Sequence, residues 1–240
     1  MSFVVEDGYN TTYISTLLTA LFHKPSIIDR VLLLDNNSHK LAGILLQRTI
    51  EKYYVTSFRY GTSITSKALN QIRNCACISG WKNTNNIDDM CNEYNPIELY
   101  EFIASLIEVI PIDLSNKKTF VIDLPNIKNT VQESFNLWQV NNTIINIPQV
   151  VIFNIKQPTQ VFNINKKIRL FQKEHDYHRI KWKFHAIICC QNEIYKTIIT
   201  IDHNLFMFSP NTYPCLSKIE SIQKNKYDKL YIIYTKEPMI

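Results

Sequence analysis

The hydrophobic periodicity of this chain of 240 residues changes near Pro111, and that change constrains the fold more than any other feature. Before Pro111, apolar residues recur at the spacing of a helix that packs one face on a core. The clearest stripe, in a helix expected over 13–22, consists of Ile14, Leu17, Leu18, Leu21 and Phe22. After Pro111, short segments rich in Val, Ile, Phe and Tyr are typical of strands. Helices followed by strands predict an α+β fold.

Further elements follow the same two patterns. Helices are expected over 27–34, 39–53 and 96–110, the last with Asn95 as N-cap and Pro96 at its first position. Strands are expected, mostly in an antiparallel sheet, over 120–125, 149–156, 160–164, 182–190, 195–201, 205–208 and 229–236. No repeat or low-complexity linker divides the chain. We therefore expect a single domain over 1–240, mainly helical over 1–112 and mainly β over 113–240, with a groove between the two lobes.

The composition is typical of a folded intracellular protein. Hydrophobic residues make up 45% of the chain and charged residues 20%, so disorder is not expected. No apolar run is long enough to span a bilayer, and the acidic Glu6 and Asp7 precede the first apolar run, unlike in a secretory signal. We therefore expect a soluble, cytoplasmic protein without a membrane partner.

The charge and the cysteines exclude further classes of partner. The formal net charge of +5 comes from Lys and Arg residues scattered along the chain, so nucleic acid is not an expected partner. The six cysteines have no paired C-x-x-C spacing and are expected to be reduced, which argues against a structural zinc. No metal and no cofactor are expected.

Few glycines and many Asn and Ile residues give the chain an excess of amino acids with A/T-rich codons. This bias fits the AT-rich genomes of several large DNA viruses and of some cellular organisms. For a virus of that kind, we expect a component of the virion, with core or assembly proteins as its partners.

Five blocks of sequence resemble one protein family. The first, GYNTTYISTL over 8–17, resembles the Gly-Asn-Thr-Cys-Tyr cysteine box of the ubiquitin-specific proteases, with one residue inserted after the glycine. The others are ELYEF over 98–102, IPQVVIFNIK over 147–156 with NKKI over 165–168, WKFHAII over 182–188 and DKLYIIY over 228–234. They resemble, in the family's order, its Glu-Phe helix and three of its strands. The resemblance implies a papain-like fold with a helical thumb, a β palm and a groove for the C-terminal tail of ubiquitin.

The resemblance also locates the family's catalytic positions in this chain. Thr12 stands at the nucleophilic Cys, Ile194 at the catalytic His and Ser209 at the third polar residue. Asn211 follows two residues later, and Asn10 matches the retained Asn on the oxyanion side. Because a Thr hydroxyl has a far higher pKa than a thiol, and Ile supplies no base, we expect a catalytically inactive deubiquitinase-like protein. It would serve as a structural or protein-interaction module, with Thr12 as a helix-start residue whose hydroxyl satisfies a backbone group.

Two alternatives stay open. An active cysteine hydrolase could use a displaced dyad, with His185 or His203 as base and Cys189 or Cys190 as nucleophile. A buried strand His and core Cys residues are the competing interpretation.

The other alternative is a protein that binds ubiquitin or a ubiquitin-like protein without hydrolysis. The fingers region, with which the family grips ubiquitin and often binds zinc, would fall within 111–146, a short stretch that contains no Cys. A strand and an amphipathic segment are expected there, over 119–137. Ubiquitin binding is therefore expected to be weak or absent.

Overall fold

The computed structural model describes residues 4–6, 8–34, 40–82, 91–114, 118–124, 128–156, 158, 162–170 and 180–237. The chain forms two compact units, Met1–Val109 with Tyr195–Glu220, and Ile110–Ile194 with Ser221–Ile240. We call them the helical unit and the sheet unit. Asp7, the loop expected at 35–37, the first residue of the helix expected over 39–53 and the start of the strand expected over 160–164 lie outside the described residues.

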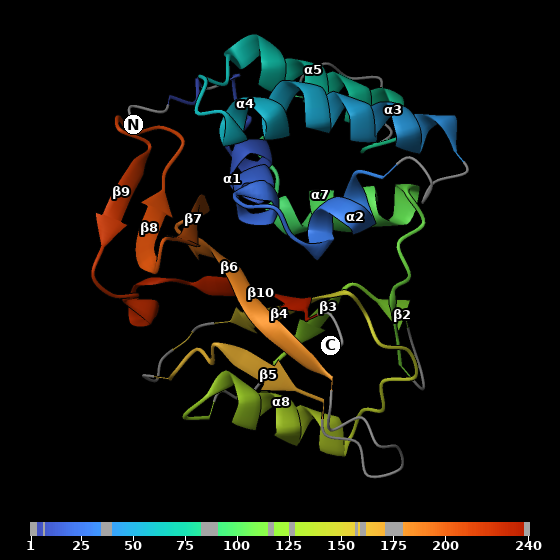
Figure 1. Cartoon of the computed structure of the whole chain (residues 1–240), viewed down its shortest axis with the longest axis vertical. Helices are drawn as coiled ribbons and strands as arrows, with labels where there is room; N and C mark the ends of the chain where they lie inside the picture. The colour runs from blue at the N-terminus through green and yellow to red at the C-terminus, as the bar shows by residue number, and fades with distance from the viewer. Residues whose placement is uncertain are drawn as a thin grey trace. The chain divides into compact units, whose positions relative to one another are not determined.

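The helical unit combines helices from the first half of the chain with three later strands. Its helical elements are α1 (Thr12–Phe22), α2 (Ile27–Leu32), α3 (Leu41–Ile50), the π-helical turn η2 (Glu51–Val55), α4 (Thr56–Arg59), α5 (Ser66–Ile78) and α7 (Pro96–Leu106). Strands β7 (Ile194–Ile201), β8 (Asn204–Phe208) and β9 (Leu216–Ile219) pair as an antiparallel meander. Figure 1 shows α3 and α5 side by side.

Helix α1 is buried on all sides within the helical unit. Every residue from Tyr13 to Phe22 is buried, although the apolar stripe covers only part of the helix. The buried Thr19 hydroxyl has a partner: its Oγ1 lies 2.6 Å from the hydroxyl of Tyr54, which donates to Ser15 O at 2.9 Å. Polar side chains are tolerated on a fully buried helix when they are hydrogen-bonded in this way.

Some helix boundaries differ from the prediction. The helix expected over 27–34 ends two residues early, at Leu32. The helix expected to end at Tyr53 continues through η2 and α4 to Arg59, since no Pro or Gly interrupts it before Gly61. Helix α5 was not predicted, because short Ala side chains and polar residues dilute its apolar stripe.

Helix α7 begins as predicted and ends early. Asn95 is its N-cap and accepts from Ile97 N at 3.0 Å, with Pro96 at the first helical position. The helix was expected to reach Ile110 but ends at Leu106. Glu108 has a positive φ of 60°, and such a residue closes a helix rather than extending it.

The sheet unit contains a mixed sheet and, among its described residues, one α-helix. Its elements are β1 (Ile112–Asp113), β2 (Lys118–Thr119), β3 (Val121–Asp123), α8 (Val131–Val140), β4 (Val150–Lys156), β5 (Lys167–Arg169), β6 (Lys181–Gln191), the 3-10 turn η4 (Lys224–Lys226) and β10 (Lys229–Lys236). The sheet has the order β3-β4-β10-β6, and β5 pairs with β6. All these pairs are antiparallel except β3 with β4, while β1 pairs separately with β2.

Helix α8 covers one face of this sheet, as Figure 1 shows for its contact with β5. Phe135 of α8 packs against Phe153 of β4, with ring centroids 5.0 Å apart, and Phe153 lies 5.8 Å from Tyr234 of β10. The three side chains are fully buried, so the core of the sheet unit lies between α8 and the sheet.

The strand predictions were confirmed except at one segment. Five expected strands appear as β4, β6, β7, β8 and β10, and the stretch 119–137 contains β3 followed by the amphipathic α8. In the segment expected as a strand over 160–164, the described residues form only an isolated bridge, between Asn163 and Thr130. Within the part of the chain that the structure describes, no helix is both long and apolar enough to cross a membrane.

Candidate functional site

The turn before α1 has an unusual backbone. Tyr9 and Asn10 both lie in the left-handed region, with φ values of 64° and 53°. Arg73 Nη1 donates to Tyr9 O at 2.7 Å, and Gly8 N donates to Thr11 Oγ1 at 2.8 Å. A Cβ on Gly8 would lie 2.9 Å from Thr11 Oγ1, so only glycine fits there. These contacts determine how the chain enters α1.

Glu93 lies at the N-terminus of α1, beside Thr12. Its Oε1 accepts a hydrogen bond from Tyr13 N at 2.8 Å and a second one from the hydroxyl of Thr12. The first turn of a helix has unpaired N–H groups and a partial positive charge, which favour a carboxylate. The expectation that the Thr12 hydroxyl satisfies a backbone group is therefore wrong. The Thr12 hydroxyl instead donates its hydrogen bond to a carboxylate, which is a stronger acceptor than a carbonyl.

Asn10 holds the segment that carries Glu93. Its Nδ2 donates to Cys91 O at 2.9 Å. Asn10, the residue expected on the oxyanion side, therefore uses one of its two side-chain N–H groups in a hydrogen bond to the chain's own backbone. As a result, Asn10 and Thr12 both bind the segment 91–93.

Aromatic side chains pack against Tyr94, the residue that follows Glu93. The ring of Tyr94 meets Tyr13 edge-on, with centroids 5.7 Å apart, and meets Trp81 at the same separation. Lys82 Nζ lies 4.6 Å from the Tyr94 ring centroid. Burial raises the pKa of the Tyr13 hydroxyl well above its ordinary range, and the Trp81 indole opposes that rise only in part. Tyr13 is therefore a neutral phenol and no candidate for a base.

The other two positions at which the resemblance places catalytic residues are Ile194 and Ser209, neither of which is a base. Ile194 begins β7, and its side chain is 63% exposed. Ser209 follows β8 and is buried, with its N–H donating to Cys215 O at 2.8 Å and its carbonyl accepting from Thr212 Oγ1 at 3.0 Å. Asn211 is exposed in the turn that follows.

Reciprocal hydrogen bonds join α1 to β7 one turn after Thr12. Thr197 Oγ1 donates to Thr16 O at 2.8 Å, and Thr16 Oγ1 donates to Tyr195 O at 3.4 Å. All three residues belong to the helical unit and are buried. The start of β7 is therefore fixed beside α1 through backbone groups.

The residues of the displaced dyad lie in unsuitable places. Cys189 and Cys190 are 1% and 4% exposed within β6. His185 is also buried in β6, where the pairing register with β10 shifts at a bulge. Four strand residues span about 13 Å, so His185 is too far along β6 to deprotonate Cys189. His203 occupies the exposed turn between β7 and β8, with a φ of 67°.

Solved structures share this architecture over nearly the whole chain. The SAGA DUB module of Ubp8, Sgf11, Sus1 and Sgf73 bound to monoubiquitin matches with a TM-score of 0.64 at 13% identity, over 100% of this chain and 70% of that one. The fold is similar to that of a ubiquitin-specific protease. A second structure of that module gives a TM-score of 0.62 at 14% identity, over 100% of this chain and 68% of that one.

The ubiquitin-specific-protease-like fold also matches a protein of another name. The structure of an essential yeast splicing factor has a TM-score of 0.55 at 11% identity, over 98% of this chain and 69% of that one. No protein-family model matches the sequence, and no curated protein does. At these identities, the likeness to the solved structures concerns the fold.

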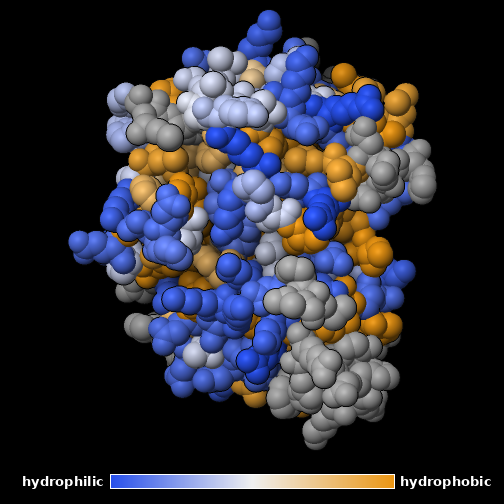
Figure 2. All heavy atoms as spheres, in the orientation of Figure 1, coloured by the Kyte–Doolittle hydropathy of each residue, from blue (hydrophilic) through white to orange (hydrophobic). Residues whose placement is uncertain are grey.

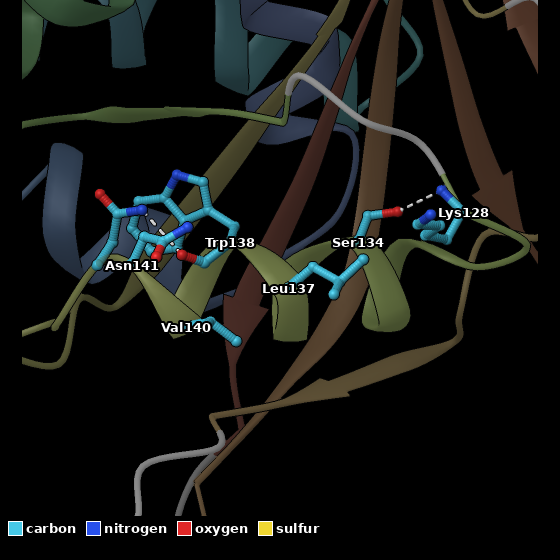
Figure 3. A pocket seen from close by; sticks show the side chains of 7 residues that line it. Lys128, Ser134, Leu137, Trp138, Val140 and Asn141 are labelled. Carbon is cyan, nitrogen blue, oxygen red and sulfur yellow. Dashed lines mark hydrogen bonds between the residues drawn. The ribbon is translucent and has the colours of Figure 1, made fainter.

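In this ubiquitin-specific-protease-like fold, α8 lies where the resemblance would insert the fingers. A hollow of about 380 Å³ lies beside α8, with Leu137, Trp138, Val140 and Asn141 around it (Figure 3). Lys128 N, at one end, donates to Ser134 Oγ at 2.9 Å. Leu137 and Val140 are 48% and 77% exposed, so the hollow is a shallow surface feature.

Among the described residues, no group of His, Cys, Asp and Glu side chains could hold a metal ion.

The role of Glu93 was missed by the sequence analysis. Glu93 was not predicted, because it lies 81 positions after Thr12 in a short segment without periodicity. The nearest signal was the N-cap at Asn95, which indicates only where α7 begins.

Proposed function

We propose that this chain is a pseudoenzyme with a papain-like, ubiquitin-specific-protease type of fold that acts by binding other proteins. The observation that carries the proposal is the carboxylate of Glu93 at the start of α1, which accepts from both Thr12 and Tyr13 N. It occupies the groups that a cysteine protease of this fold would need for attack on a carbonyl.

The first argument concerns the nucleophile. Attack by a hydroxyl requires a strong base within hydrogen-bond reach. The partner of the Thr12 hydroxyl is a carboxylate, and a carboxylate is too weak a base to deprotonate an alcohol. Ile194 supplies no imidazole and Ser209 no carboxylate. Loss of nucleophile and base together removes both attack and proton transfer.

The second argument concerns the oxyanion. A tetrahedral intermediate is stabilised by N–H donors aimed at its negative oxygen. Tyr13 N, a donor at the start of α1, is already bound to Glu93 at 2.8 Å. An oxyanion at this place would meet a negative carboxylate, so the site disfavours the intermediate.

The third argument is the range of proteins with this fold. One structural neighbour is named as a splicing factor, whereas the others are named as modules of a deubiquitinase. A fold of this kind can therefore host different functions. This supports a role in protein assembly. Core or assembly proteins of a virus would be one such set of partners.

The structural neighbour bound to monoubiquitin favours a second candidate function, which is non-hydrolytic binding of ubiquitin or a ubiquitin-like protein. Against tight binding stands the stretch between α7 and β4, which is occupied by β3 and α8 instead of a long insertion. We therefore expect the affinity for ubiquitin itself to be weak.

The proposal is tested by incubating the full chain with ubiquitin propargylamide and, separately, with a fluorogenic ubiquitin C-terminal amide, beside an active ubiquitin-specific protease. We expect no adduct by mass spectrometry and no fluorophore release above the buffer rate. A covalent adduct on any cysteine, abolished by a C189S or C190S substitution, would establish the displaced dyad and refute the proposal. Titration of labelled ubiquitin on the same sample tests the second candidate.

A further inference from the structure

Four cations gather on one face of the sheet unit. Strands β5 and β6 pair in a register that sets Lys167 opposite Lys183 and Arg169 opposite Lys181. Side chains alternate between the two faces of a strand, so these four lie on the same face. The central pair, Ile168 and Trp182, points to the other face and is fully buried. We call Lys167, Arg169, Lys181 and Lys183 the cation cluster.

The cation cluster is not explained by folding. Directly opposed side chains have Cβ atoms about 5 Å apart, and like charges at that distance destabilise a pair of strands. The next position on the same face lies about 7 Å along the strand. Any polar residue would satisfy these solvent-facing positions, and both opposed pairs carry two positive charges.

One carboxylate of the chain already binds at the margin of the cluster. Glu237 Oε1 lies 2.7 Å from Lys167 Nζ, and Glu237 N donates to Lys181 O at 2.9 Å. The backbone bond places the segment after β10 alongside β6. Among the described residues, no acidic side chain forms an ion pair with Arg169, Lys181 or Lys183. The cluster therefore offers three further cations to a ligand.

The backbone of Arg169, at the edge of β5, is already hydrogen-bonded, which favours binding of a ligand through side chains. Gln132 of α8 accepts from Arg169 N at 2.6 Å and donates to Arg169 O at 3.0 Å. These bonds use the backbone groups that an added strand would need. Figure 2 shows hydrophilic residues over β5 and α8.

We propose that the cation cluster binds an acidic segment of a protein partner, through its Asp or Glu carboxylates. Glu237 shows that a carboxylate on an extended segment fits beside Lys167 and Lys181. Nucleic acid is disfavoured, because none of the aromatic side chains of β5 and β6 is exposed for base stacking and the cluster is only two residues long on each strand. The inference rests on the proposed binding function and gives it a surface.

The test is a titration of the full chain into a fluorescein-labelled peptide of ten residues with six Glu, followed by fluorescence anisotropy at low salt. We expect binding that weakens as salt rises. The K181E/K183E variant should bind at least tenfold more weakly. The matched control, K67E/K218E, makes the same change of net charge at exposed positions of the helical unit and should bind within twofold of the unmodified chain.

A second pair of variants tests the role of the internal carboxylate. E237Q removes the group that competes for Lys167 and should tighten peptide binding about two- to threefold. E220Q makes the same charge change at an exposed residue of the helical unit and should leave binding unchanged. Circular dichroism confirms that each variant is folded.

Three results would overturn the inference. The first is the absence of peptide binding by the unmodified chain. The second is an equal loss in K181E/K183E and K67E/K218E, which would mean that only net charge matters. The third is tighter binding of a single-stranded oligonucleotide with the same number of charges. None of these results bears on the ubiquitin propargylamide experiment, so the two proposals fail separately.

Discussion

Glu93 Oε1 accepts hydrogen bonds from the Thr12 hydroxyl and from the backbone N–H of Tyr13, so one carboxylate completes the N-terminus of α1. The two residues lie 81 positions apart in the sequence. Their contact joins the turn before α1 to the segment before α7. It has consequences for stability as well as for chemistry.

Removing this carboxylate should destabilise the chain. E93A leaves Tyr13 N and the Thr12 hydroxyl without their acceptor, so we expect the free energy of unfolding to fall by about 1 kcal/mol, as for the loss of a helix cap. Because Glu93 is exposed, the loss should not reach several kcal/mol. E93Q keeps an acceptor oxygen and should lose less. Urea denaturation measures all three proteins, and an equal loss in E93Q and E93A would contradict a role as acceptor.

The buried hydroxyl of Tyr54 should contribute to holding α1 in place. Y54F removes the hydroxyl that donates to Ser15 O and that accepts from the buried Thr19 hydroxyl, so Thr19 Oγ1 loses its acceptor. An unpaired buried polar group costs about 1–3 kcal/mol, and we expect a loss in that range by denaturant titration. The exposed Tyr60 provides the control, since Y60F should change stability by less than about 0.5 kcal/mol. Equal effects of Y54F and Y60F would contradict a stabilising role of the Tyr54 hydroxyl.

The N-cap of α7 offers a simple local test. Asn95 Oδ1 accepts from Ile97 N at 3.0 Å, so N95A should reduce the free energy of unfolding by about 1 kcal/mol. N95D retains the acceptor and adds a charge that the helix N-terminus favours, and it should stay close to the original stability. Thermal unfolding followed by circular dichroism compares the three proteins. If N95D were as unstable as N95A, another contact of Asn95 would be responsible.

Stability should fall at alkaline pH. Burial raises the pKa of the Tyr227 hydroxyl from an unfolded value of 10.0 to about 12, and the nearby Cys189 thiol adds to the rise. Between these values, the folded chain keeps a proton that the unfolded chain releases, so the free energy of unfolding falls as the pH rises. The contribution of the neutral Tyr227 to stability is complete below pH 10 and is lost as the pH rises through about 12. Buried Tyr13, Tyr54, Tyr100 and Tyr234 have raised pKa values for the same reason. Urea titrations at pH 9, 10 and 11 should show the decline.

The Y227F variant isolates one of these groups. It lacks the ionisable hydroxyl, so its stability should fall less steeply between pH 10 and 12 than that of the unmodified chain. Identical slopes for the two proteins would show that Tyr227 does not contribute.

The sequence predicted those elements whose signal is local. The stripe from Ile14 to Phe22 gave α1, and Asn95 with Pro96 gave the start of α7. Helix α5 escaped the prediction, because its apolar face uses Ala as well as larger residues. The early end of α7 also escaped it, since the positive φ of Glu108 has no signature in the residue type. The likeness of the fold to a ubiquitin-specific protease, expected from five blocks, agrees with the structural neighbours.

By itself, the sequence determined the order of most helices and strands and, through the resemblance of its five blocks, predicted that Thr12, Ile194 and Ser209 stand at a family's catalytic positions. Both follow from residue type and spacing, which the chain carries before it folds. Only the tertiary structure decided what Thr12 contacts and that four scattered cations meet on β5 and β6. Such contacts join residues far apart in the chain, and strand register and loop packing, not local propensity, bring them within hydrogen-bonding or electrostatic range.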